Sequence, residues 1–245
     1  MGEYILLGIL QGIFEWIPIS SEGVVALASQ VMKKDLNPVD IALFLHLGTL
    51  LAVLFYFKKD WIHVLTLKDL PLIRFLVIAT IVSLTVGYPL YNGIRDAAVG
   101  NGLLVIMGFG LLFTAYVQKK EKKTKLSFDQ LAVVSGFLQG LAVIPGLSRS
   151  GSTIFGLSLA KIPTFEVLKL SFMMSVPVVI VSSTYLFLKN PSLISEAWLS
   201  LVSSFMFGLL SLHVLISLVK KINFFTFALG FSILCFLGAA VGFLS

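Results

Sequence analysis

Charged residues are scarce in this sequence. Asp, Glu, Lys and Arg make up 12% of the 245 residues, whereas about 25% is usual in a soluble domain. Hydrophobic residues make up 58% of the chain, and the mean hydropathy is +1.00, which is more than one soluble core of this size can hide. Lipid is therefore the expected solvent for most of the surface, and the sequence predicts an all-α integral membrane protein.

Other features are rare or missing. Cys235 is the only cysteine, so the chain can form no internal disulfide. Residues 1–18 contain Glu3 and Glu15 and lack the arrangement of a removable signal peptide, so we expect none. The pattern of a nucleotide-binding P-loop, GxxxxGK followed by Ser or Thr, does not occur.

Six apolar runs are each near the roughly 20 residues that cross a bilayer. They cover residues 41–57, 72–90, 102–117, 170–188, 198–219 and 224–244. Two further apolar stretches, residues 4–27 and 131–159, are interrupted by polar segments that contain proline, glycine and serine. Proline and glycine end a helix, and each half is too short to span alone. Broken helices are tolerated at membrane depth where the freed backbone is buried in protein or lines a wet cavity.

The basic residues gather in alternate loops. Lysines follow the first, third and fifth predicted spans, and placing these loops in the cytoplasm puts most of the 18 basic residues inside. We therefore interpret the net charge of +6 as membrane topology and expect no nucleic-acid partner. Both flanks of residues 131–159 then lie inside and both flanks of residues 4–27 lie outside. The two polar turns enter from opposite faces and can meet near the midplane.

The two broken segments resemble each other. Each has a Gln-Gly pair, at residues 11–12 and 139–140, followed by a proline-containing turn and then by three candidate spans. We predict a single membrane domain, residues 1–245, made of two repeats in inverted orientation, about residues 1–118 and 128–245. Inverted repeats commonly place a binding site where discontinuous helices meet.

The polar residues of the second turn suit a phosphate group. Arg149 is the most informative of them, because a guanidinium gives bidentate hydrogen bonds to phosphate and keeps its charge. An ionisable group at bilayer depth is costly, which makes it a functional candidate. A new helix opens near Thr153, and its N-terminal dipole favours negative charge. Small or hydroxyl residues that can bring donors to an anion surround Arg149, namely Gly146, Ser148, Ser150, Gly151, Ser152 and Thr153.

Glu15 is the predicted acidic partner of Arg149. It could hold a divalent cation against phosphate oxygens or act as a base toward water. Gln11 lies one helical turn earlier on the same face and could add a carbonyl ligand. The alternative is a buried Glu15–Arg149 ion pair that only joins the repeats, which would leave the serines without a purpose. His46 could line the site, but a packing histidine is the simpler interpretation.

These motifs resemble a known family. Residues 11–23 (QGIFEWIPISSEG) and 145–153 (PGLSRSGST) are similar to the two signatures of the undecaprenyl-diphosphate phosphatase family, also called the bacitracin-resistance family. The resemblance extends to residues 46–53 and 170–177, and so covers most of the chain. It implies a multi-pass plasma-membrane enzyme that hydrolyses undecaprenyl diphosphate to the monophosphate and inorganic phosphate. That reaction recycles the lipid carrier of cell-wall or glycan synthesis.

The resemblance also implies roles for individual residues. Glu15 would be the essential carboxylate and, with Gln11, would hold the divalent cation, Mg²⁺ or Ca²⁺. Ser21 would lie close to the reacting phosphorus, and Arg149 would grip the diphosphate. The catalytic set is then Glu15, Ser21 and Arg149, and the substrate-binding set is Gln11, Ser20, Gly146, Ser148, Ser150 and Thr153. A homodimer whose site opens to the outer face is implied as well.

One departure from the family affects the mechanism. Many members have a histidine just after Ser-Ser-x-Gly, where this chain has Val24. Either Ser21 or a metal-bound water attacks here, or another group has taken the place of the histidine, or the activity is altered. The same phosphate cradle could also serve a transporter or flippase of a phosphorylated polyprenyl lipid, or a phosphatase of a different lipid. Release of inorganic phosphate distinguishes the transporter from the enzymes.

Overall fold

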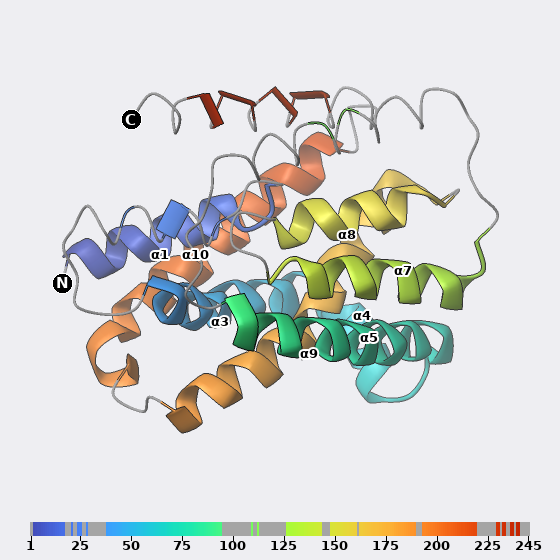
Figure 1. Cartoon of the computed structure of the whole chain (residues 1–245), viewed down its shortest axis with the longest axis horizontal. Helices are drawn as coiled ribbons and strands as arrows, with labels where there is room; N and C mark the ends of the chain where they lie inside the picture. Colours follow the sequence, from blue (N-terminus) through green and yellow to red (C-terminus); the bar gives the residue numbers. More distant parts are fainter. Residues whose placement is uncertain are drawn as a thin grey trace.

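The computed structural model describes residues 2–17, 21, 24–25, 28, 38–94, 109, 112, 126–143, 148–160, 162–189, 193–219, 229–230, 232–233, 236–237 and 239–240. Its helices are α1 (Gly2–Phe14), α3 (Pro38–Tyr56), α4 (Lys58–Leu65), α5 (Leu70–Ile94), α7 (Phe128–Leu141), α8 (Arg149–Ser158), α9 (Thr164–Lys189) and α10 (Leu193–Val219) (Figure 1). No β-strand occurs among the described residues, as expected for an all-α fold.

Among the described residues, three helices are long and apolar enough to cross a membrane. The segments that pass are Leu70–Tyr91 in α5, Thr164–Tyr185 in α9 and Trp198–Leu218 in α10. A fourth span is possible if α3 is taken together with α4, which turns away from it by 86°. Most residues of the predicted spans at 102–117 and 224–244 lie outside the described part of the chain, so the total of six stays a prediction.

Ion pairs tie together the charged ends of four helices. Lys169 near the start of α9 lies 3.4 Å from Asp60 of α4, and Arg74 near the start of α5 lies 2.6 Å from Asp129 of α7. Lys58 begins α4, in a stretch that the sequence suggested to be a loop. Two of the basic residues predicted to flank spans on the cytoplasmic side, Arg74 and Lys169, thus pair with acids of neighbouring helices.

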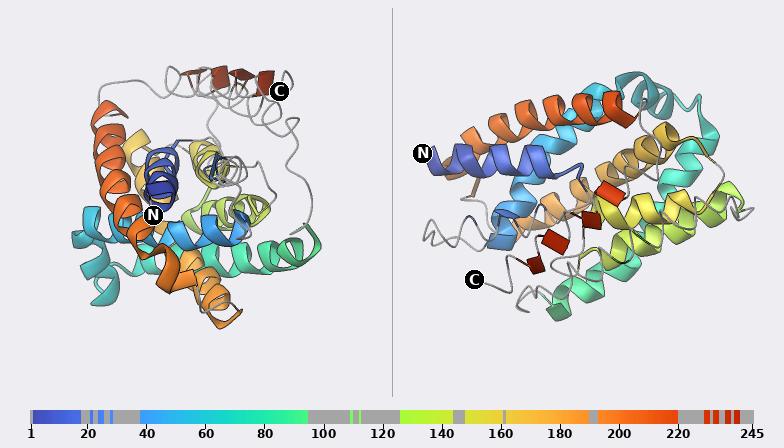
Figure 2. Two further views of the ribbon diagram at one scale, coloured as in Figure 1. Left: turned by 90° about the vertical axis from the view of Figure 1, so that its left-hand side faces the viewer. Right: turned by 90° about the horizontal axis from the view of Figure 1, so that it is seen from above.

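The half-helix α1 runs side by side with α10 and in the same direction (Figures 1 and 2). Two glycines of α1, Gly8 and Gly12, face α10, and a Cβ added at either would come within 2.6 Å of that helix. Ser211 of α10 donates a hydrogen bond of 2.7 Å to the backbone oxygen of Gly12. Glycines spaced four apart allow this close approach of two helices, as is typical of membrane bundles.

The half-helix α7 packs along α5 in a similar way. Gly136 and Gly140 face α5, and an added Cβ at either would come within 2.7 Å of it. Ser83 of α5 donates a hydrogen bond of 2.9 Å to the backbone oxygen of Gly136. The two half-helices are thus each fixed to a long helix from a distant part of the chain.

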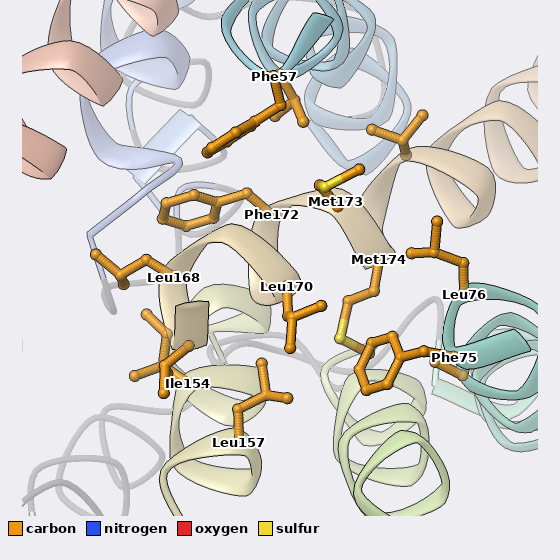
Figure 3. Close-up of a cluster of buried hydrophobic side chains, with 14 of the residues drawn as sticks. Phe57, Phe75, Leu76, Ile154, Leu157, Leu168, Leu170, Phe172, Met173 and Met174 are labelled. Carbon is orange, nitrogen blue, oxygen red and sulfur yellow. The ribbon is translucent and has the colours of Figure 1, made fainter. Parts of the chain in front are cut away.

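Helix α9 passes through the centre of the bundle, and its side chains form much of the core (Figure 3). Phe172, Met173 and Met174 are fully buried there, against Phe75 of α5 and Leu157 of α8 among others. The outer faces of the long helices are also apolar, with exposed Val77, Ile81, Ile180, Met206 and Leu210. An exposed apolar surface on every long helix is what a lipid solvent allows.

Candidate active site

Four side chains converge on the carboxylate of Glu15, which directly follows α1 and is 3% exposed. Gln11 Nε2 and Ser21 Oγ donate hydrogen bonds to Oε2, at 2.6 and 2.9 Å. His46 Nε2 lies 3.2 Å from the same oxygen. Arg149 Nη2 donates to the other oxygen, Oε1. The described part of the site therefore gathers groups from both broken segments and from α3 around one buried acid.

Arg149 reaches Glu15 because it is the first residue of α8. The preceding Ser148 is the N-cap, and its Oγ accepts a hydrogen bond from the backbone N–H of Gly151 at 3.2 Å. A serine N-cap satisfies one of the free amides of the first turn and fixes where the helix begins. The cap therefore places Arg149 at the start of α8, directly after the polar turn of the second broken segment.

A second contact joins the two broken segments. Ser150 Oγ donates a hydrogen bond of 3.0 Å to the backbone oxygen of Ile17, just beyond Glu15. Ser148 and Ser150 also share a hydrogen bond of 3.0 Å between their hydroxyls. The predicted meeting of the two interrupted helices is thus present in the structure, and the described residues form an ion pair and a hydrogen bond across it.

The remaining predicted substrate-binding residues differ in what the structure shows. Thr153 is fully buried, and its hydroxyl bonds to backbone oxygens of its own helix and to Ser171 Oγ of α9 at 2.6 Å. These contacts connect α8 to α9. A direct contact of Thr153 with the substrate stays a prediction. Ser20 and Gly146 lie outside the described residues, and so do Pro18 and Pro145.

A cavity of about 250 Å³ lies beside the cluster, between α3, α5, α7 and α9. His46 and Arg149 are on its wall, so it reaches the partners of Glu15. Further polar residues on the wall are Ser83, Gln139, Ser175 and Ser182, and the rest is aliphatic apart from Tyr88, Tyr91 and Tyr185. Arg149 Nη1 is buried and has no hydrogen-bond partner within the described part of the chain. A guanidinium with one unused amino group on a cavity wall is suited to bind an anion there.

The sequence left two interpretations of His46, a residue that lines the site or a packing histidine, and favoured packing. The ring is buried, but it also contacts Glu15 and lines the cavity. Its Nδ1 lies 2.6 Å from the backbone oxygen of Ala42, and a carbonyl only accepts, so Nδ1 is the donor. The signal that could have found it is a histidine inside an apolar span, which is costly without a function. An imidazole thus reaches the site although position 24 is valine.

The residues around Glu15 fit a divalent cation. No group of three His, Cys, Asp or Glu side chains with ligand geometry was found in the described ranges, but amide and hydroxyl oxygens also bind hard cations. Gln11 Oε1 is fully buried and lacks a hydrogen-bond partner among the residues described. Such an orphaned acceptor is costly, and a cation shared with Glu15 would satisfy it once the amide is turned so that Oε1 takes the place of Nε2 beside Glu15. The prediction that Glu15 and Gln11 hold a metal is therefore chemically reasonable here.

The fold and the cluster define a class: a helical membrane protein that holds an acid, a guanidinium and an anion-sized cavity inside an apolar bundle. The chain belongs to the family of the bacitracin resistance protein BacA, whose family model matches residues 4–237. It is 33% identical to an undecaprenyl-diphosphatase of Methanococcoides burtonii over 96% of each chain. It is 36% identical to that of Haloarcula marismortui over 90% of each chain. The family resemblance inferred from the two signatures is confirmed.

Proposed function

We propose that this protein is a membrane phosphatase that hydrolyses undecaprenyl diphosphate to undecaprenyl phosphate and inorganic phosphate. The observation that carries the proposal is the buried contact between Glu15 and Arg149 from two broken helices, beside a cavity among apolar helices whose wall includes Arg149. The relatives in the BacA family with the name undecaprenyl-diphosphatase support the same reaction.

The site suggests how the reaction is distributed among the side chains. Arg149 binds the diphosphate oxygens, where charge must be stabilised during phosphoryl transfer. Ser21 donates its hydroxyl hydrogen to Glu15 Oε2 at 2.9 Å, so Glu15 is placed to take this proton as Ser21 Oγ attacks the terminal phosphorus. The bond between phosphorus and the bridging oxygen breaks, and undecaprenyl phosphate leaves. Water then attacks the phosphorus on Ser21, the bond from phosphorus to Ser21 Oγ breaks, and Glu15 returns its proton to Ser21 Oγ. The second proton of water leaves with the inorganic phosphate.

The cation that we propose is Mg²⁺ or Ca²⁺, held by Glu15 and Gln11. When bound, it would neutralise negative charge on the diphosphate oxygens. Support comes from the buried and unpartnered oxygen of Gln11 and from its position one turn before Glu15.

The cavity limits which part of the lipid can enter. Its volume is about 250 Å³, whereas typical ligand pockets have volumes of about 300–1,000 Å³. This volume suits a phosphate head group and is far too small for an undecaprenyl tail. The tail therefore stays among the outer apolar helix faces and the surrounding lipid.

We also propose the finer architecture that the sequence predicts: six spans and two re-entrant segments in an inverted repeat, with repeats at about residues 1–118 and 128–245. The reciprocal packing supports it, since α1 lies along the second long helix of the other repeat, α10, and α7 lies along α5. A plasma-membrane location, a homodimer and a role in recycling the cell-wall lipid carrier complete the proposal, on the strength of the family resemblance.

The test is phosphate release from undecaprenyl diphosphate by the purified full-length protein in nanodiscs. Glu15→Gln and Arg149→Lys are expected to lower the rate at least about 100-fold. Glu166→Gln and Arg74→Lys are matched controls, because both residues form ion pairs away from the site, and they are expected to keep the wild-type rate. Lipid binding without phosphate release in the wild type would favour a transporter instead. Equal rates in all five proteins would refute the catalytic assignment.

A further inference from the structure

We propose that His46 is a third protein ligand of the divalent cation and binds it through Nε2, beside Glu15 and Gln11. The inference deepens the proposed site and rests on the prediction that Glu15 holds a cation there. It does not depend on whether the bound lipid is hydrolysed. The argument comes from how the His46 ring is held and from what surrounds Oε2 of Glu15.

The His46 ring is oriented as in a metal-binding histidine. Its Nδ1 donates to the backbone oxygen of Ala42 at 2.6 Å, which leaves Nε2 as the ring atom that carries a lone pair when the ring is neutral. Metal-ligating histidines commonly donate their other ring N–H to a backbone carbonyl or a carboxylate, which fixes the tautomer and the ring direction. The His46 side chain is buried, so this orientation is held by the surrounding helix packing.

The spacing of the two facing atoms fits a shared cation. His46 Nε2 lies 3.2 Å from Glu15 Oε2. When the ring is neutral, two lone pairs face each other there, which is unfavourable in a buried site unless a cation lies between them. Two ligands that each lie about 2.1 Å from one cation are roughly 3.0 Å apart in octahedral and roughly 3.4 Å apart in tetrahedral coordination. The observed distance falls between these values.

The other donors gather on the same oxygen. Gln11 Nε2 and Ser21 Oγ lie 2.6 and 2.9 Å from Glu15 Oε2. Turning the Gln11 amide over would put its unpartnered Oε1 in the place of Nε2, and the two positions differ little in shape. Arg149 bonds to the opposite oxygen, Oε1. The carboxylate is thus divided, with one oxygen for the guanidinium and the other for both the Ser21 hydroxyl and a cation.

A nitrogen ligand changes which metals the site accepts. Oxygen ligands alone suit Mg²⁺ and Ca²⁺, whereas an added imidazole strengthens binding of transition metals. Mn²⁺ accepts both kinds of ligand and is paramagnetic, so it reports directly on its ligands. We expect the site to bind Mn²⁺ more tightly than Mg²⁺ because of His46.

The experiment measures Mn²⁺ bound to the full-length protein without substrate, purified through an affinity tag that contains no histidine. Electron paramagnetic resonance titration gives the dissociation constant, and electron spin echo envelope modulation detects nitrogen-14 bound to the metal. The expected result is one Mn²⁺ per chain with imidazole nitrogen modulation. His46→Gln should abolish the modulation and raise the dissociation constant about 10-fold or more, and Glu15→Gln should abolish binding.

His213→Gln is the matched control, because His213 is an exposed histidine of α10, and it should leave both readouts unchanged. If His46→Gln does not fold, wild type labelled with nitrogen-15 histidine gives the same answer, since the modulation must change to the nitrogen-15 frequencies. Mn²⁺ bound without imidazole modulation would overturn the proposal even in an active phosphatase, and so would no binding at all. Imidazole modulation in a protein that releases no phosphate would support it while the phosphatase assignment failed.

Discussion

The half-helices α1 and α7 are held in the bundle by the same means. In each, two glycines four residues apart lie against a long helix, and a serine of that helix donates a hydrogen bond to a glycine carbonyl. Each also carries a buried glutamine one residue before its second glycine, Gln11 in α1 and Gln139 in α7. Their side chains, however, meet different partners.

Gln11 bonds to Glu15, which lies four residues later. Gln139 bonds instead to Ser83 Oγ at 3.1 Å and to the backbone oxygen of Met174 at 3.2 Å, and the residue four positions later is Val143. The packing is therefore duplicated and the chemistry is divided, with the acid in the first broken segment and the guanidinium in the second. Opposite charges from the two segments can then compensate each other where they meet.

The largest effect on phosphate release should come from removing the acid of the first broken segment. Glu15→Ala is expected to lower phosphate release about 100- to 10,000-fold, because it removes the group that can accept the Ser21 proton. Val143→Ala, the same change at the corresponding position of the second segment, should lower it less than about threefold. Steady-state phosphate release by both variants checks this, and similar losses in the two would mean that the segments are equivalent.

Both half-helices should respond alike to a change in the shared packing. An added Cβ would lie 2.6 Å from Gly208 N at position 12 and 2.7 Å from Val86 Cβ at position 140. Gly12→Ala and Gly140→Ala are each expected to destabilise the protein by about 1–3 kcal/mol, measured by thermal unfolding in nanodiscs. Gly2→Ala is the control, because nothing lies within 4 Å of its added Cβ. A loss at only one of the two glycines would show that one half-helix packs differently.

Effects of intermediate size are expected at the two glutamines. Substituting each one distinguishes a role in metal binding from a role in packing. Gln11→Leu removes a predicted cation ligand and is expected to raise the Mg²⁺ concentration that gives half-maximal activity about 10-fold or more. Gln139→Leu removes two hydrogen bonds and should cost about 1–3 kcal/mol of stability, with that Mg²⁺ concentration unchanged. The measurement is phosphate release over a series of Mg²⁺ concentrations. An equal rise in the half-maximal Mg²⁺ concentration in both variants would contradict the assignment of metal binding to the first segment alone.

The smallest effect is expected for an ion pair outside the site. Arg74 is largely exposed and lies 2.6 Å from Asp129, and exposed pairs contribute about 0–1 kcal/mol. Arg74→Gln should therefore shift unfolding slightly and leave phosphate release unchanged. A large loss of activity would mean that this end of the bundle matters to the reaction.

The meeting of Glu15 and Arg149 could be predicted from the sequence, since helix breakers, lysine bias and the cost of intramembrane charge all pointed to it. The contact of His46 with Glu15 could not. Apolar side chains of α3 lie on all of its faces. Its sequence therefore does not show which face turns toward the site. The turn of 86° between α3 and α4 was missed for a similar reason, because a short helix with several charges has the composition of a loop.

A double-mutant cycle on phosphate release tests most directly whether Glu15 and Arg149 act as one unit. The rate constant kcat/KM is measured for wild type, Glu15→Gln, Arg149→Lys and the double variant. The structure predicts that the double variant loses little more than the worse single variant, because groups that act together are strongly non-additive. Losses that multiply would mean that the acid and the guanidinium act independently, and unchanged rates would mean that neither takes part.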